Sequence, residues 1–152
     1  MREILFRGRQ TDKDKWVYGV PVKATSKDES EILIIESVFA CDEYLCRGCE
    51  FTPVIPSTVG QYTDLTDKNG KKIFEGDILR TGTRMGYILF EKGCFRFRWK
   101  NFDKYRGDFF KTCIITEYGS FRGLEVIGNI HDNPELLKGG AERWLVNGMK
   151  NM

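Results

Sequence analysis

Short runs of strand-forming residues, separated by turns that contain glycine, recur along most of this chain. They include EILIIESVF at 31–39, VGQYTDL at 59–65, KKIFEGDIL at 71–79 and MGYILFEKGCFRFRWK at 85–100. Strands of this length at this spacing are typical of all-β barrels and sandwiches. We therefore expect a mainly β fold, a partly open β-barrel or a more complex β structure, with a short C-terminal helical segment.

The turns in the middle of the chain carry the clearest local signals. Asn69-Gly70 separates two strand-like runs and predicts a type I′ hairpin turn, in which both central residues need positive φ. Gly76-Asp77 predicts a second sharp corner, where the Asp77 carboxylate bonds the backbone as the next strand begins. A third turn is expected near Lys92-Gly93. We interpret Asn69, Gly70, Gly76 and Asp77 as structural turn residues.

Other segments fit the strand pattern less well. Pro21 interrupts the run KWVYGVPVKA and predicts an edge strand or a bulge. Residues 42–60 hold two prolines and two glycines, so we expect an extended loop there. HDNPELL at 131–137 predicts a short helix with Asn133 as N-cap and Pro134 in its first turn. AERWLVNGM at 141–149 predicts one more.

These segments suggest three parts. They are an N-terminal β or extended portion (1–58), a central barrel-like portion ending in a short helix (59–137), and a tail (138–152). The longest apolar run, ILIIESVFA, is interrupted by Glu36 and is too short to span a bilayer. Five cysteines, an odd number, and no apolar signal core at the N-terminus favour reduced thiols in a cytoplasm.

The acidic residues of the central block allow a metal site but do not require one. If Gly70 held the sixth position of an EF-hand loop, positions one and twelve would be Leu65 and Gly76, so the two main ligands are missing. Asp64, Asp67, Glu75 and Asp77 fit turn and cap roles better. We expect Asn at 64 and 67 to leave stability nearly unchanged. A metal-dependent hydrolase stays as an alternative.

The cysteines supply half of a zinc signature. Cys46 and Cys49 have the spacing at which two thiolates share one zinc ion, and Cys41 is a further candidate ligand. No second close pair completes the site, so we expect no bound cofactor, with zinc as the alternative. The lone histidine, His131, lies beside the predicted helix cap and is interpreted as a local hydrogen-bonding residue. We assign no catalytic residue.

A basic and aromatic segment at 81–122 offers a nucleic-acid alternative. It holds nine basic and four acidic side chains. In CFRFRWK, aromatic and basic residues alternate, and alternation sends the two sets to opposite faces of a strand. We expect Phe95, Phe97 and Trp99 to be buried and the cations to be exposed. The candidate phosphate-binding residues are Arg96, Arg98, Lys100, Lys104 and Arg106.

Three segments resemble the YopX family of phage and prophage proteins. They are REILFRG at 2–8, QYTDLTDKNGKKIFEGDIL at 61–79 and LEVIGNIHDNPELL at 124–137. The resemblance implies a mainly β fold and a phage or prophage origin, and it supplies no catalytic residues. The chain departs from the family pattern at Asp64, where glycine is expected, and at FRGRQ, where an aromatic residue is expected after the arginine.

Together these observations predict an accessory phage or prophage protein in the cytoplasm of a bacterial host. We expect it to act by binding and not as an enzyme, with an unknown protein or a second copy as partner and no membrane association. A homo-oligomer is expected because short strands expose edges and because the tail carries Trp144, Leu145 and Val146. The alternatives are the nucleic-acid-binding β module and the hydrolase.

Overall fold

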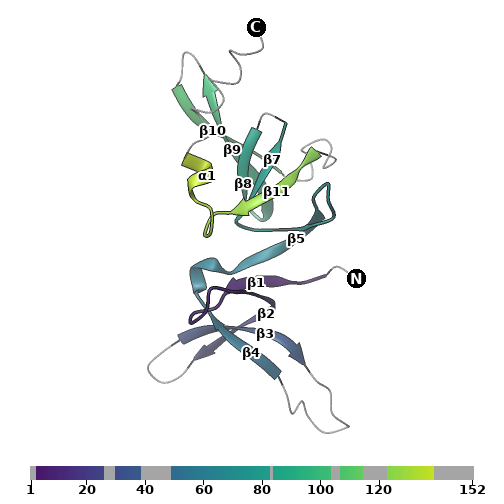
Figure 1. The fold of residues 1–152 in the computed structure, drawn as a ribbon, viewed down its shortest axis with the longest axis vertical. Helices are drawn as coiled ribbons and strands as arrows, with labels where there is room; N and C mark the ends of the chain where they lie inside the picture. The colour runs from purple at the N-terminus through teal and green to yellow at the C-terminus, as the bar shows by residue number, and fades with distance from the viewer. Residues whose placement is uncertain are drawn as a thin grey trace. The chain divides into compact units, whose positions relative to one another are not determined.

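The computed structural model describes residues 3–25, 30–38, 49–82, 84–103, 107–114 and 123–138, and the structural statements below concern those residues. The protein is mainly β, with two antiparallel sheets and one short helix near the C-terminal end of the described chain (Figure 1). This confirms the expected fold class. The described strands form open sheets, and neither sheet closes into a barrel.

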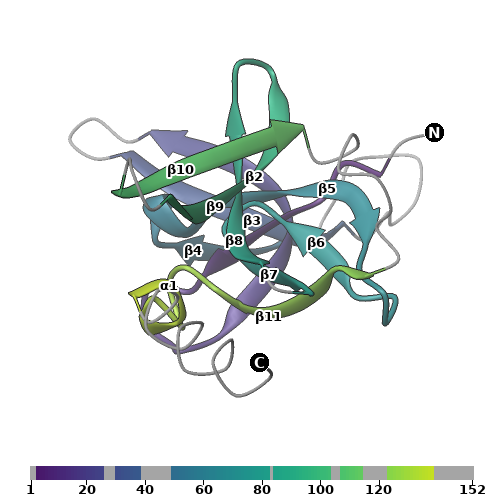
Figure 2. The same ribbon diagram turned by 90° about the horizontal axis from the view of Figure 1, so that it is seen from above.

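The described strands follow one another along the chain. They are β1 (Phe6–Arg9), β2 (Trp16–Thr25), β3 (Ser30–Val38), β4 (Cys49–Val54), β5 (Gly60–Thr66), β6 (Lys72–Phe74), β7 (Asp77–Thr81), β8 (Arg84–Glu91), β9 (Cys94–Asp103), β10 (Gly107–Ile114) and β11 (Glu125–Asn129). A 3₁₀ turn, η1 (Pro56–Thr58), precedes β5, and the helix α1 (Glu135–Lys138) follows β11 through the turn at 130–134 (Figure 2). The sheets have the strand orders β4-β3-β2-β1-β5-β6 and β10-β9-β8-β7-β11.

The chain divides into two compact units, Met1–Tyr62 and Thr63–Met152. The division falls within β5. Its first residues, Gly60 and Gln61, pair with β1 in the first unit. The remainder of β5 belongs to the second unit, together with β6 and the five-stranded sheet. Each unit has its own cluster of buried apolar residues, and the two clusters share no residue.

The sheet of the first unit curls until the end of β1 meets the end of β4. Gln10 forms a bridge with Val54, and the Thr11 amide donates to the Pro53 carbonyl at 3.1 Å. The curled sheet encloses a small core of Val17, Ile34 and Val54, against which Ile32 and Val59 pack.

Gly19 permits close contact between strands inside this curl. A β-carbon at Gly19 would lie 1.9 Å from the carbonyl oxygen of Ile35 in β3, where no side chain fits. The tight approach of β2 to β3 therefore requires glycine at this position.

The core of the second unit is larger and rests on the alternation of β9. Phe95, Phe97 and Trp99 are buried, as predicted, and the rings of Phe97 and Trp99 stack with centroids 5.4 Å apart. The other members of the cluster are Ile73, Leu79, Ile88 and Leu124. Since successive side chains of a strand point to opposite faces, this places Arg96 and Arg98 on the other face of the sheet.

The predicted hairpin at Asn69-Gly70 is present, but the predicted turn type is wrong. Gly70 has a φ of 81°, whereas Asn69 is not among the residues with positive φ. The Gly70 amide donates to the Asp67 carbonyl at 3.0 Å, and the Asp67 amide donates to Lys71 at 2.8 Å. This is a type I turn followed by a glycine bulge, a common three-residue hairpin loop.

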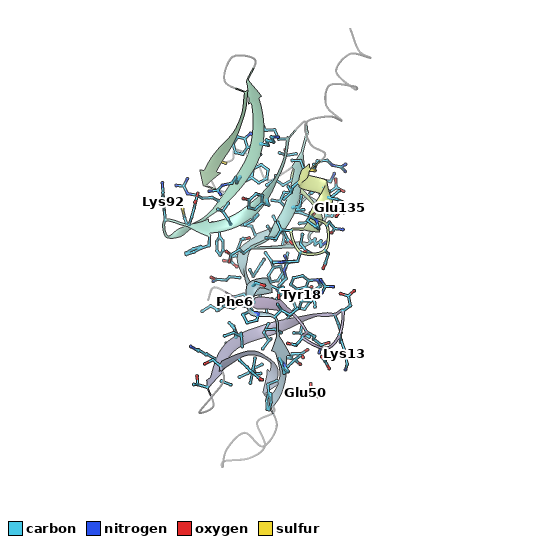
Figure 3. All side chains as sticks on the ribbon, turned by 90° about the vertical axis from the view of Figure 1, so that its left-hand side faces the viewer. Phe6, Lys13, Tyr18, Glu50, Lys92 and Glu135 are labelled. Carbon is cyan, nitrogen blue, oxygen red and sulfur yellow. The ribbon has the colours of Figure 1, made fainter. Side chains whose placement is uncertain are left out.

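The type I′ turn lies instead at the tip of the β8–β9 hairpin. Lys92 and Gly93 have φ values of 52° and 78°, and they separate the paired residues Glu91 and Cys94. Lys92 extends from this tip (Figure 3). The turn was expected near these residues, and its geometry matches the right-handed twist of the flanking strands.

The prediction of a loop over 42–60 is wrong for its second half. Residues 49–54 form β4, which pairs with β3, and Pro53 lies opposite Leu33. Pro53 is tolerated because β4 is the last strand of its sheet, where a missing amide costs no ladder hydrogen bond. Pro21 is explained in a similar way, since residues 20–25 of β2 pair only with β3.

The predicted helix at 131–137 is confirmed as the short α1. The Asn133 side chain, however, bonds to a residue that precedes it: its Oδ1 accepts from the Asn129 amide at 3.4 Å. The helix predicted at 141–149, the tail residues Trp144, Leu145 and Val146, and the thiols Cys41 and Cys46 lie outside the described residues, as do Lys104 and Arg106.

Candidate interaction surface

Asp67 is the most heavily used carboxylate of the central block. It is buried in the hairpin that joins β5 to β6, and its Oδ1 accepts from the amides of Asn69 and Lys71 at 2.8 and 2.9 Å. Its Oδ2 accepts from the amide of Val126 in β11 at 3.0 Å. One side chain therefore stabilises the turn and ties it to a strand 59 residues away in sequence.

These hydrogen bonds decide the charge state of Asp67. Burial by itself would raise the pKa of the carboxyl group. The amides of Val126, Lys71 and Asn69 and the positive charge of Lys71 outweigh burial, so the pKa lies below its ordinary value. Asp67 is thus an ionised group whose acceptor oxygens are engaged by backbone donors.

The neighbouring carboxylates also bond to the backbone. Asp77, 1% exposed, accepts from the Phe74 amide at 2.7 Å across the corner that contains Gly76. Glu75 accepts from the Phe90 amide at 3.3 Å. Gly76 has a φ of 83°, and its amide donates to Ile88. The Gly76-Asp77 corner is therefore a turn, as the sequence indicates.

The backbone conformation of Asp64 gives a physical reason why glycine is expected at this position. Its φ is 69°, in the left-handed region that favours glycine, and its side chain is exposed. Among the described residues, no three His, Cys, Asp or Glu side chains come together as metal ligands. The acidic block thus shapes the backbone, with Asp64 at a position better suited to glycine.

The basic face of β9 is less open than expected. The expectation that Arg96 and Arg98 are exposed is wrong, because both are partly buried beside Glu91. Arg98 Nη2 lies 2.9 Å from Glu91 Oε2, and Arg96 Nε lies 4.0 Å from Glu91 Oε1. A hydrogen bond to Tyr87, helped by Glu91, raises the pKa of Arg98. Lys100 is exposed.

The thiols and the histidine do not meet in the described chain. Cys49 begins β4, while its predicted partner Cys46 lies outside the described residues, so the zinc alternative stays a prediction. Cys94 and Cys113 are partly buried. The His131 amide donates to the Asn129 side chain at 2.9 Å, in a turn where Asp132 bonds to the same oxygen.

A surface that the sequence interpretation missed lies on the outer face of β2, β3 and β4. Residues directly opposite in antiparallel strands share one face of the sheet. Val20 lies opposite Ile35, which lies opposite Phe51, and Val22 lies opposite Leu33, which lies opposite Pro53. We call this surface the apolar face. Its members are Tyr18, Val20, Val22, Leu33, Ile35, Phe51 and Pro53.

Several of these side chains are unusually accessible for strand residues. Tyr18, Val20, Val22 and Phe51 are 47, 50, 41 and 61% exposed, and Leu33 and Ile35 are partly exposed between them. The strands that carry the apolar face are labelled in Figure 1, and Tyr18 in Figure 3. Isolated exposed apolar residues are ordinary, but a contiguous group is typical of an interaction site.

The apolar face has a signal in the sequence. Residues 32–35, ILII, are apolar at every position, and Tyr18, Val20 and Val22 alternate along β2. A strand that is apolar on both faces normally lies between two covering layers. Only one face of β3 is enclosed by the curl of the first unit, with Ile34 fully buried and Leu33 and Ile35 partly exposed.

None of the described helices is both long and apolar enough to span a membrane.

Comparison with known proteins finds a matching family model and a similar crystal structure. A family model described as YopX protein matches residues 5–138. The chain is also similar to the crystal structure of protein EF1440 from Enterococcus faecalis, with a TM-score of 0.54 and 26% sequence identity, over 90% of this chain and 99% of that one. A search of curated proteins finds no match.

Proposed function

The chain belongs to the YopX family, and from this premise we propose that it is a phage- or prophage-encoded accessory protein that binds other proteins in the cytoplasm of a bacterial host. It acts by binding and not by catalysis. The observation that carries this proposal is the apolar face, where aromatic and β-branched side chains from three adjacent strands are exposed together.

The composition of the apolar face suits protein recognition. The central part of an interface is poor in charge and rich in aromatic and aliphatic side chains. Phe51 and Tyr18 supply large rigid rings, and the two valines between them supply branched aliphatic surface. In the described strands, the rows Val20–Ile35–Phe51 and Val22–Leu33–Pro53 contain no charged residue.

The use of the carboxylates supports a non-enzymatic role. Metal-dependent hydrolysis needs carboxylate oxygens that are available to a cation or a water molecule. The carboxylate oxygens of Asp67 and Asp77 accept hydrogen bonds from backbone amides. If these oxygens bound a metal ion instead, the amides would lose their acceptors. The described chain therefore favours a structural interpretation of these residues.

Nucleic-acid binding is the weaker alternative. Arg96 and Arg98 are engaged with Glu91, so phosphate would have to compete with a carboxylate already in place. The aromatic residues of β9 are buried and cannot stack on bases.

The proposal is tested by affinity capture of the tagged full chain from bacterial cells that carry the parent phage or prophage. Val20→Glu places a charge in the middle of the apolar face. Ile4→Glu makes the same change at a residue that is 64% exposed and lies on neither central row. Wild type and Ile4→Glu should retain the same proteins, and Val20→Glu should lose them. Equal retention by all three, or enrichment of nucleic acid alone, would refute the proposed function.

A further inference from the structure

We propose that Asn69 is a site of spontaneous covalent modification, at which the hydrogen bonds of Asp67 control the rate. The side-chain amide becomes the carboxylate of aspartate or isoaspartate, and water is the co-reactant. The isoaspartyl product disrupts the hairpin between β5 and β6. This inference does not depend on the proposed function, because residues 67–71 belong to the second unit and the strands of the apolar face to the first.

The residue that follows Asn69 permits attack on its side chain. The Gly70 nitrogen can close a five-membered ring by bonding to Cγ of Asn69. Glycine carries no β-carbon to hinder this approach. Both residues are exposed, and a β-carbon at Gly70 would have no atom within 4 Å apart from its chain neighbours. The site is therefore open both to ring closure and to water.

The chemistry proceeds in two balanced steps. Ring closure forms a bond between the Gly70 nitrogen and Asn69 Cγ and breaks the bond between Cγ and Nδ2. The Gly70 nitrogen gives up its proton, and the side-chain nitrogen leaves as ammonia. Water then opens the cyclic imide. Cleavage of the new bond gives aspartate, whereas cleavage of the original peptide bond gives isoaspartate, in which the main chain runs through Cβ and Cγ.

The folded hairpin opposes the first step. The Gly70 amide must lose its proton to attack, but in the structure it donates to the Asp67 carbonyl at 3.0 Å. The amides on either side, those of Asn69 and Lys71, both donate to Asp67 Oδ1, at 2.8 and 2.9 Å. One residue thus fixes three consecutive amides. Ring closure requires the hairpin to open locally, so its rate follows the population of the open state.

The isoaspartyl product is incompatible with these hydrogen bonds. It lengthens the main chain by one methylene group before Gly70, so the amides of Gly70 and Lys71 cannot both keep their places against Asp67. Oδ2 of the same carboxylate accepts from the Val126 amide of β11 at 3.0 Å, and Figure 2 labels β5, β6 and β11. Modification at residue 69 therefore also weakens the connection between the hairpin and β11.

The first test follows conversion of Asn69 in the full chain by peptide mapping with mass spectrometry at mildly alkaline pH. A second Asn-Gly pair, Asn147-Gly148, lies outside the described residues and serves as an internal reference. Asp67→Ala should raise the rate at Asn69 at least several-fold and leave the rate at Asn147 unchanged. In concentrated urea, where the hairpin is absent, wild type and Asp67→Ala should convert Asn69 at the same rate.

The controls locate the reaction and keep the test decisive. Asn69→Gln, which would have to close a larger ring, should abolish the product in this peptide. If Asp67→Ala does not fold, Asp67→Asn, which keeps one acceptor oxygen, should raise the rate at Asn69 by a smaller factor. Equal rates at Asn69 in folded wild type and in urea would overturn the control by Asp67. No product at Asn69 in urea would overturn the site itself.

The second test examines the product. The isoaspartyl form, separated from unmodified protein by chromatography, should show faster amide hydrogen exchange in β6 and β11. The variant Asn69→Asp has the aspartyl product without the lengthened main chain, so its exchange should change less. If the isoaspartyl form exchanges as slowly as the unmodified protein, the hairpin tolerates the modification and the structural consequence proposed here is wrong.

Discussion

Asp64 occupies a backbone conformation that an L-residue with a side chain adopts at a cost. Its φ of 69° lies where glycine is unstrained, and aspartate tolerates this region better than most residues. The resemblance to the YopX family led us to expect glycine at this position. The structure supplies a physical reason for that expectation.

Replacing Asp64 with glycine should therefore raise the free energy of unfolding, by a few tenths to about 1 kcal/mol, because relief of strain exceeds the extra entropy of the unfolded chain. Asp64→Ala, whose methyl group does not favour positive φ, should lower it by a similar amount. Urea denaturation of the two variants measures the difference. If both changes have the same sign, residue 64 does not have this conformation in solution.

Asp67 requires a correction to the expectation that its replacement by Asn is nearly neutral. The side chain accepts three backbone hydrogen bonds, and an amide can replace the carboxylate only in part. Asp67→Asn should cost about 1–3 kcal/mol of unfolding free energy. The exposed Asp64→Asn should change it little and serves as the control.

The stabilisation by Asp67 should depend on pH with a definite sign. Its pKa is lowered in the folded state, so the unfolded chain binds the proton first as pH falls. The contribution is complete above the unfolded pKa of about 3.9 and is lost as pH falls through the lower folded value. The stability difference between wild type and Asp67→Asn should therefore be largest near neutral pH and shrink below pH of about 4. A difference that is constant with pH would contradict this assignment.

At the scale of the elements, β9 shows how far period-two alternation is reliable. It correctly placed the three aromatic residues in the core. Alternation did not reveal that the cations on the opposite face of β9 lie beside Glu91. Glu91 belongs to β8, and only the pairing of β8 with β9 brings it close to these cations.

Trp99→Ala should cost about 3–5 kcal/mol, as for other large buried aromatic residues, since it removes the ring that stacks on Phe97. The double change of Arg96 and Arg98 to Ser should cost less than about 1 kcal/mol, because partly exposed ion pairs contribute little. Denaturant titration measures both. The salt dependence of any DNA or RNA binding should be the same with and without the arginines. A loss of about two units of slope would instead show that both contact phosphate.

At the scale of the whole molecule, the two units should differ in how they respond to a cavity. Ile34 and Ile88 are both fully buried, and they belong to clusters that share no residue. Ile34→Ala should increase amide hydrogen exchange mainly in β2, β3 and β4, and Ile88→Ala mainly in β7, β8 and β9. Hydrogen exchange measured by mass spectrometry on peptides from each unit would show which strands lose protection in each variant. Equal loss of protection in both units for either variant would mean that they open as one.

Local signals in the sequence determined the fold class, most of the strands, the corners at Gly70, Gly76 and Gly93, and the burial of Phe97 and Trp99. Positive φ and period-two alternation act over a few residues, so they can be read without knowing the neighbours. Where the same rules failed, as at Asn69, two turn types were compatible with the same residues, and the hydrogen bonds of Asp67 selected one.

Tertiary structure alone decided which strands pair, and with them every property that depends on a distant partner. Residues 49–54 form β4 because they pair with β3. The Asp67 carboxylate is hydrogen-bonded because the chain brings the Val126 amide next to it. Gly19 is required because the Ile35 carbonyl lies against it. The apolar face was missed for the same reason. Alternation shows that Val20 and Val22 share a face, but burial depends on which layers cover that face, and the pattern within one strand contains no information about them.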